Sequence, residues 1–340
     1  MAPPVSVSAT GAVHLGPRVV CDGFAYGANI RVQSHIHVDH MTEFDTSKGF
    51  QDLLMTEPTR DLLIAERNAD LEYRENIKTL QFGQEAIFDG DRIKLISGGH
   101  ILGSVQTSVE LPDGIRVGYS GDFRWPLESV IEVDWLVVDS TYGAPDRIRQ
   151  YTQKDVEERF VELVVKQLHV GSLRIKAHRG TLQRALELLA GCIDVPIVGT
   201  QAICKEAEVY RRWGYCLEPI LQARSEEAKT ATKGKHVSVY GTMERWPEVT
   251  PGFSTIVLSA FMVGPKDPVT SYSGRAFRVA MSDHADFNGT IDYVAATGAK
   301  YALTDAVRGA RAEELAGELK RKLGIVALAS TSPPSSEWGS

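Results

Sequence analysis

One short segment of the chain combines three imidazoles and a carboxylate: His35-Ile36-His37-Val38-Asp39-His40. The run before it, residues 30–34, alternates apolar and polar side chains, which predicts a strand that opens into a loop. That alternation puts His35 and His37 on one side of the backbone, whereas Asp39 and His40 turn towards a second point. Because imidazole and carboxylate suit zinc, this segment, here called the hexad, predicts two metal ions side by side. The alternative is a solvated loop, which is disfavoured because three of the nine histidines fall within the hexad.

Further histidines and aspartates stand singly at the ends of predicted strands. Glycines on both sides of His100 let the backbone approach another group closely. Sites in layered α/β folds are built at strand ends, so these side chains are expected to gather near the hexad. They are Asp22, His100, Asp122, Asp139, His284 and Asp305.

Several of these residues also have a plain structural interpretation. Asp122 follows a glycine and fits a turn, and Asp139 fits the N-cap of a helix. His284 fits the start of a helix, with Asp286 as a local cap. A ligand or catalytic role is favoured for the first three, and a structural role for Asp286.

Composition describes an ordinary globular chain. It has 340 residues, 43% of them hydrophobic and 24% charged, with a formal net charge of −7. This acidity argues against strong non-specific binding to nucleic acid but leaves room for a local basic groove. No apolar run is long enough to span a membrane, and the N-terminus lacks the features of a secretory signal. The four cysteines form no C-x-x-C pair, so reduced thiols in a cytoplasmic protein are expected.

The element pattern changes after about residue 145. Up to residue 144 it predicts short strands, a helix over 56–68 and a hairpin over 105–119. From 145 to 280, helices and strands alternate, which predicts a small parallel sheet with right-handed crossovers. Residues 281–340 return to helices over 290–296 and 312–323 and strands over 301–304 and 325–328. The sequence therefore predicts an α/β protein with a second α/β block inserted in it.

These motifs resemble those of a known superfamily. The hexad, Gly99-His100 and Ser120-Gly121-Asp122 resemble the metallo-β-lactamase fold, and the likeness extends over nearly the whole chain. Asp139-Ser140-Thr141-Tyr142-Gly143 and Ser282-Asp283-His284-Ala285-Asp286 resemble its β-CASP branch of nucleases. The resemblance implies an αββα sandwich formed by 1–144 and 281–340. An α/β cap, 145–280, would be inserted in it, with substrate entering between the two.

The resemblance also implies a role for each residue. Two zinc ions, with manganese as an alternative at either position, would be held by His35, His37, Asp39, His40, His100, Asp122 and Asp305. Asp122 would bridge them, and Asp22 would fix a ligand histidine by a hydrogen bond. The catalytic set would be Asp39, Asp122, His284 and Asp139, with His284 donating a proton and Asp139 orienting it.

One position departs from the family pattern. RNA-cutting members carry a histidine in a Val-His-Gly run where this chain has Leu303-Thr304-Asp305. Asp305 is therefore either a ligand or a spectator, and in the second case the other metal position is weaker or takes in His284. The segment 282–287, followed by Thr297-Gly298-Ala299, looks most like the ligase-associated DNA exonucleases.

These comparisons predict a metal-dependent nuclease, with a DNA exonuclease favoured and an RNA-processing nuclease as the alternative. DNA would be the favoured partner, together with a DNA ligase or another repair protein. A lactonase or thioesterase lacks the inserted block and is less expected, as is a non-catalytic scaffold. Contacts to phosphate are expected from Arg174, Lys176, Arg179, Arg275 and Arg278.

Overall fold

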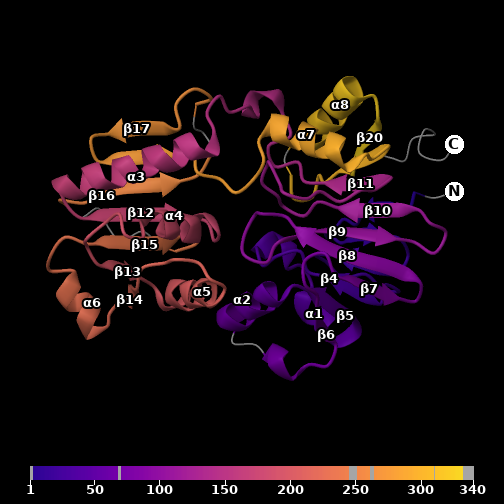
Figure 1. Cartoon of the computed structure of the whole chain (residues 1–340), viewed down its shortest axis with the longest axis horizontal. Coiled ribbons are helices and arrows are strands. Elements are labelled where there is room, and N and C mark those ends of the chain that lie inside the picture. Colours follow the sequence, from indigo (N-terminus) through magenta and orange to yellow (C-terminus); the bar gives the residue numbers. More distant parts are fainter. Residues whose placement is uncertain (1–2, 68–69, 245–250, 261–263, 310, 332–340) are drawn as a thin grey trace. The chain divides into compact units, whose positions relative to one another are not determined.

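The computed structural model describes residues 3–67, 70–244, 251–260, 264–309 and 311–331 (Figure 1). The chain separates into two compact units. Unit 1 comprises residues 1–64, 69–148 and 284–340, and unit 2 comprises residues 65–68 and 149–283.

The first sheet of unit 1 is formed by the N-terminal strands in chain order. Its strands are β1 (Val5–Val7), β2 (Val13–Leu15), β3 (Val19–Cys21), β4 (Ile30–Val32), β5 (Asp52–Met55) and β6 (Ile77–Thr79). The pairs from β3 to β6 are parallel, so their carboxyl ends share one edge. Asp22 follows β3 and the hexad follows β4, which brings both segments to that edge.

The second sheet of unit 1 joins strands from both ends of the chain. Its strands are β7 (Glu85–Phe88), β8 (Asp91–Ser97), β9 (Val105–Glu110), β10 (Arg116–Tyr119), β11 (Trp135–Val138), β19 (Tyr301–Thr304) and β20 (Val326–Ala329). β7 to β10 pair antiparallel, whereas β10, β11, β19 and β20 are parallel. The carboxyl ends of β10, β11 and β19 therefore present residues 122, 139 and 305 at one edge.

The two sheets pack face to face around an apolar core. Val32 and Leu54 of the first sheet are buried in one cluster with Val105 and Val137 of the second. On the other face of the second sheet, α7 (Phe287–Thr297) and α8 (Ala312–Leu323) form a second cluster (Figure 1). α1 (Phe44–Phe50) packs on β5 of the first sheet, and α2 (Glu57–Arg67) buries Leu62 and Leu63. The order helix, sheet, sheet, helix confirms the predicted αββα sandwich.

Unit 2 contains one sheet in the order β14-β13-β15-β12-β16-β18-β17. Its strands are β12 (Leu173–Ala177), β13 (Ile197–Gly199), β14 (Ile220–Gln222), β15 (Val237–Gly241), β16 (Ser254–Leu258), β17 (Val269–Ser273) and β18 (Ala276–Val279). Only the β17–β18 pair is antiparallel among these. Its helices are α3 (Gln153–Val170), α4 (Thr181–Leu189), α5 (Gln201–Arg212) and α6 (Glu226–Ala231). This is the predicted inserted α/β block. Across the described parts of both units, no helix has the length and apolarity needed to cross a bilayer.

Candidate metal centre

Four side chains from three segments of unit 1 meet at one point. His35 and His37 come from the hexad, His100 from the turn after β8, and Asp122 from the end of β10. Their ligand atoms all lie within 4.8 Å of one another. His35 Nε2 and His100 Nε2 each lie 3.5 Å from Asp122 Oδ2. The structure thus brings together the residues predicted for the first metal position.

A second set of donors adjoins the first through Asp122. His40 Nε2 lies 3.3 Å from Asp122 Oδ1 and 3.6 Å from Asp39 Oδ2. The short 3-10 turn Val38–His40 produces this arrangement, because it turns the chain out of the extended conformation directly after His37. His40 is fully buried, whereas the side chain of Asp39 is 60% exposed. Asp122 therefore lies between two groups of donors.

The donor set fits a metal ion by chemistry and by spacing. His35 Nε2 and His40 Nε2 are buried and have no hydrogen-bond partner, which is costly for a polar atom unless something binds it. Two ligands at the usual zinc–nitrogen distance with tetrahedral angles lie about 3.3 Å apart. The separations around Asp122 are close to that value, and several are too long for good hydrogen bonds. These clusters could therefore hold metal.

The histidine pKa values differ between the two sets. Burial lowers the pKa of His35 to about 3, and it also lowers the pKa of His37. Both are therefore neutral, as metal ligands must be. Burial also opposes a charge on His40, but Asp122 and Asp22 outweigh it and raise the pKa of His40 to about 10. In the metal-free protein, the His40 proton thus supplies positive charge between two carboxylates.

Asp22 lies directly behind the hexad. Its Oδ2 accepts a hydrogen bond from His40 Nδ1 at 2.7 Å, and its Oδ1 accepts one from the backbone N–H of Ser34 at 2.7 Å. The backbone of Asp22 has φ of 55°, a left-handed conformation that is uncommon for a residue with a side chain. The hydrogen bond between Asp22 and His40 Nδ1 holds the imidazole with Nε2 directed at Asp122.

His284 and Asp139 approach the same carboxylate from another side. His284 Nδ1 donates to Asp139 Oδ2 at 3.1 Å, and His284 Nε2 lies 3.7 Å from Asp122 Oδ2. Asp139 Oδ1 also accepts from the backbone and hydroxyl of Thr141, so its local turn role and its contact with His284 coexist. Asp286 is the N-cap of α7 and accepts from the backbone of Gly289, which confirms its structural role.

Asp305, for which the sequence left a ligand role and a spectator role open, is bound by residues of its own turn. Its Oδ2 accepts from Arg308 at 2.8 Å, and its Oδ1 accepts from the backbone of Val307. The three metal-capable groups found among the described residues include neither Asp39 nor Asp305. For Asp305 the reason is local: Asp305 and Arg308 are three residues apart in the turn after β19, and both are buried.

The predicted phosphate contacts in unit 2 differ in how accessible they are. Arg174 is only 6% exposed, and its guanidinium lies over the ring of Phe253 at 4.4 Å. Arg179 is bound by carboxylates of Glu206 and Glu66. The charged groups of Arg174 and Arg179 are therefore already bound by other residues of unit 2. Lys176 and Arg278 are half-buried, and Arg275 is exposed.

Sequence reasoning missed the residues that support the hexad from within β4 and beside it. Arg31 and Gln33 occupy the polar positions of the alternating run, yet both are fully buried. Arg31 donates to the backbone oxygens of His40 and Thr42, and Gln33 donates to those of His35 and His40. The alternation predicted the strand correctly but gave no sign that its polar side chains would be buried.

The turn that carries His100 is held by the N-terminal end of α2. The hydroxyls of Thr56 and Thr59 donate to the backbone oxygen of Gly103 at 2.7 and 3.0 Å. Gly103 has φ of 80°, and a Cβ there would lie within 2.7 Å of both threonines. The hydroxyl of Ser104 accepts from the backbone of His100. The predicted close approach of the backbone at these glycines is thus present.

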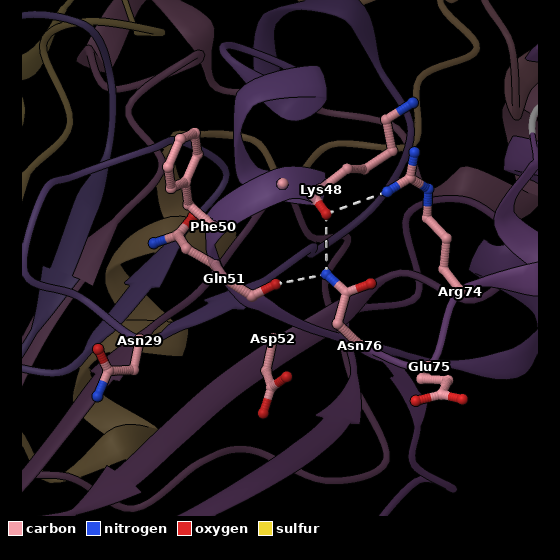
Figure 2. Close-up of a pocket in the computed structure, with 9 residues that line it drawn as sticks. Asn29, Lys48, Phe50, Gln51, Asp52, Arg74, Glu75 and Asn76 are labelled. Carbon is pink, nitrogen blue, oxygen red and sulfur yellow. Dashed lines mark hydrogen bonds between the residues drawn. The ribbon is translucent and has the colours of Figure 1, made fainter.

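The pocket drawn in Figure 2 lies away from this chemistry. It has a volume of about 680 Å³ and is lined by residues that precede or begin β4, β5 and β6, among them Asn29, Asp52 and Asn76. Because these strands are parallel, the pocket is at their amino ends, whereas the hexad follows the carboxyl end of β4. Asn76 donates to the backbone oxygens of Lys48 and Gln51, so its amide serves to join loops.

Comparisons with known proteins show which sequences this chain resembles. No model of a known protein family matches the sequence. A protein of Acidianus ambivalens described as an uncharacterized protein in the lig 3′ region is 29% identical over 138 residues, 40% of this chain and 98% of that protein. An RNase J-like protein of Methanocaldococcus jannaschii is 28% identical over 218 residues, 55% of this chain and 51% of that protein. A probable DNA ligase of Opitutus terrae is 24% identical over 285 residues, 80% of this chain but only 26% of the ligase.

A solved structure extends the likeness to the fold. The crystal structure of a protein of unknown function from Enterococcus faecalis V583 has a TM-score of 0.59 at 14% identity, covering 84% of this chain and 76% of that one. Similarity at this level bears on architecture alone. Together with the αββα sandwich, the sequence matches show that the chain is similar to metallo-β-lactamase-fold nucleases of the β-CASP branch.

Proposed function

We propose that this protein is a metal-dependent nuclease that hydrolyses phosphodiester bonds of nucleic acid, with zinc at two positions. One observation carries the proposal: donors from His35, His40 and His100 converge on the two oxygens of Asp122, and two of those nitrogens are buried without a partner. His35, His37 and His100 would hold one ion, Asp39 and His40 the other, and Asp122 both. Bound zinc supplies Lewis acidity and positive charge at the phosphate.

The side chains around the donors, Asp22, His284 and Asp139, would each have a separate role. Asp22 would keep His40 aligned, because it accepts the hydrogen bond from Nδ1 and leaves Nε2 for the metal. His284 would donate a proton to the leaving oxygen from Nε2, since Nδ1 is occupied by Asp139. Asp139 would stabilise the charged imidazole and orient it, as the carboxylate of a catalytic triad does.

DNA is the proposed substrate, degraded from an end. The segment 282–287 and the match along most of this chain to a protein named a probable DNA ligase support this choice. A DNA ligase or another repair protein is the corresponding partner. RNA is the second candidate, because the RNase J-like relative is named for an activity on RNA. Residues 145–280 would act as a cap that contributes phosphate contacts, with exposed Arg275 as the first residue to test.

A matched cleavage assay tests the proposal. Zinc-loaded protein is incubated with end-labelled single- and double-stranded DNA and RNA of one sequence, beside His284→Ala and a control, His169→Ala, exposed near the end of α3. Stepwise loss of DNA from one end, abolished only by the first variant, is expected. Cleavage of RNA with DNA spared would reverse the substrate assignment and retain the site. No cleavage by protein that holds two metals would overturn the nuclease proposal.

A further inference from the structure

Arg308 is a buried cation that the proposed chemistry does not use. Its side chain is 4% exposed and lies in the turn after β19. In the sequence, residues 149–283 of unit 2 separate this turn from the hexad. All three nitrogens of the Arg308 side chain have partners. NH1 donates to Asp305 Oδ2 at 2.8 Å, NH2 to the backbone oxygens of Gly11 at 2.6 Å and Asp22 at 3.1 Å, and Nε to that of Asp39 at 3.2 Å.

Two of these carbonyls belong to residues of the metal centre. Under the proposed function Asp39 and His40 would both be donors of the second position, and Asp22 contacts His40 through a hydrogen bond. A single guanidinium thus joins the backbone of Asp22, whose side chain contacts His40, to the backbone of the hexad, which carries both Asp39 and His40. A planar fork with five N–H groups can bind several acceptors at once in fixed directions, which the single ammonium of lysine cannot do.

Both oxygens of the Asp305 carboxylate already accept hydrogen bonds from the turn that follows β19. Oδ2 binds Arg308, and Oδ1 accepts from the backbone N–H of Val307. The residue is 1% exposed, so Arg308 without this carboxylate would be a buried charge with only neutral acceptors. Asp305 is thus placed as the counterion of the buried Arg308 guanidinium.

We propose that Arg308 is a positioning residue for the metal position formed by Asp39, His40 and Asp122, and that Asp305 is its counterion rather than a metal ligand. The inference rests on the proposed function only in that a metal binds at this position. It adds a residue that the sequence did not suggest, and for Asp305 it chooses the spectator role over the ligand role.

The change in metal affinity of Arg308→Met has opposite signs under this inference and under the alternative that Asp305 is a metal ligand. If Arg308 positions the ligand segments, Arg308→Met weakens metal binding at the second position. If Asp305 were a ligand held back by Arg308, the same change would free the carboxylate and tighten binding. In addition, Asp305→Asn combined with Arg308→Met is expected to be no worse than Arg308→Met alone, because both changes act through one pair.

The experiment measures cobalt and zinc binding to the full chain without reference to cleavage. Metal content is found by elemental analysis, affinity by competition with a chromophoric chelator, and ligand geometry by the visible spectrum of bound Co²⁺. Arg308→Met is expected to lower affinity at one position by about 10–100-fold and to change the cobalt spectrum. Arg308→Lys is expected to restore little of either, because it keeps the charge but not the fork.

A matched control separates positioning from general loss of stability. Arg18 makes a comparable two-bonded pair with buried Asp91 in unit 1, beside the amino end of β3 and thus opposite Asp22. Arg18→Met is expected to lower stability with metal affinity and spectrum unchanged. Should Arg308→Met not fold, Arg308→Lys takes its place with the same criterion. Unchanged or tighter metal binding in the variant that folds would overturn the inference, and failure of the wild type to bind metal would instead overturn the proposed function.

Discussion

Asp122 is the residue on which the site depends. Nitrogens of His35, His40, His100 and His284 lie 3.3–3.7 Å from its two oxygens. Burial alone would raise its pKa, but His40 and His284 reverse this effect and hold the pKa of Asp122 well below its usual range. A carboxylate kept ionised in a buried position is suited to binding two cations.

Replacing this charge tests its role with little change of shape. Asp122→Asn is expected to lose metal and to lower the cleavage rate by more than about 100-fold. Replacing a residue that only hydrogen-bonds to a metal ligand already lowers affinity or activity by about 10–100-fold, and Asp122 would be a ligand itself. Metal content by elemental analysis and cleavage rate are measured together, with circular dichroism as the check on folding. Wild-type metal content and turnover in a folded variant would remove Asp122 from the centre.

At the scale of elements, the contact between α2 and the turn at Gly103 determines where His100 lies. Gly103→Ala is expected to lower stability through two separate effects. The backbone at this position has a positive φ, and the added Cβ would meet Thr56 and Thr59. The second effect shifts the turn and lowers metal affinity. Gly114→Ala is the matched control, since Gly114 has φ of 84° but nothing within 4 Å of an added Cβ.

Urea unfolding and zinc affinity are measured for both variants. Both are expected to lose about 1 kcal/mol or more from backbone strain. Only Gly103→Ala is expected to lose additional stability and to bind zinc more weakly. Equal effects of the two variants on zinc affinity would show that the contact with α2 does not position His100.

A buried network in unit 2 gives a pH-dependent expectation. Glu206 of α5 accepts from Arg179 and from Gln183. Burial raises the pKa of Glu206 above its ordinary value of 4.5, although Arg179 acts in the opposite direction. The folded state therefore holds this proton more tightly than the unfolded state. This contribution to stability is present below pH 4.5 and is lost as the pH rises through the folded pKa.

Glu206→Gln removes that titration and keeps an acceptor for Arg179. Its urea midpoint is expected to depend less on pH than that of the wild type in the range just above pH 4.5. Glu208→Gln, on the same helix but exposed, serves as the control and is expected to leave the dependence unchanged. A wild-type pH profile in Glu206→Gln would show that the carboxyl does not titrate in this range.

The sequence predicted the long, periodic elements and the local motifs. The structure has β19 and α8 with the predicted bounds, and α7 begins at Phe287 rather than 290 because Asp286 caps it. Short strands such as β1 and β14 were missed, because three residues show no period.

Long-range contacts to backbone atoms were also beyond prediction. Arg308 reaches the backbone oxygen of Asp39 across 269 residues, and a carbonyl has no side-chain identity that a motif could reveal. Arg174 shows the converse limit. Its charge suggested a phosphate contact, but charge does not report exposure, and its guanidinium is covered against Phe253.

At the scale of the whole molecule, metal is expected to stabilise one unit selectively. All the proposed ligands belong to unit 1, so a ligand that binds only the folded form raises the stability of that unit. Zinc at about 1,000 times its dissociation constant would contribute about 4 kcal/mol per site.

Hydrogen exchange with mass spectrometry checks this expectation. Removal of metal with a chelator is expected to lower protection in peptides that contain β4, the hexad and β10, and to leave unit 2 peptides unchanged. Re-addition of zinc should restore the protection. An equal loss in both units would mean that the two unfold as one cooperative system.

The interrupted course of unit 1 along the chain has a consequence for its synthesis. β11 leaves the ribosome before the residues of unit 2, and its parallel neighbour β19 leaves after them. Until then β11 has an open edge, which is a site for wrong pairing. The candidate metal centre likewise lacks His284 and Arg308 until the residues of unit 2 have been synthesised. The nascent chain can therefore assemble the candidate metal centre only after the whole of unit 2 has been synthesised.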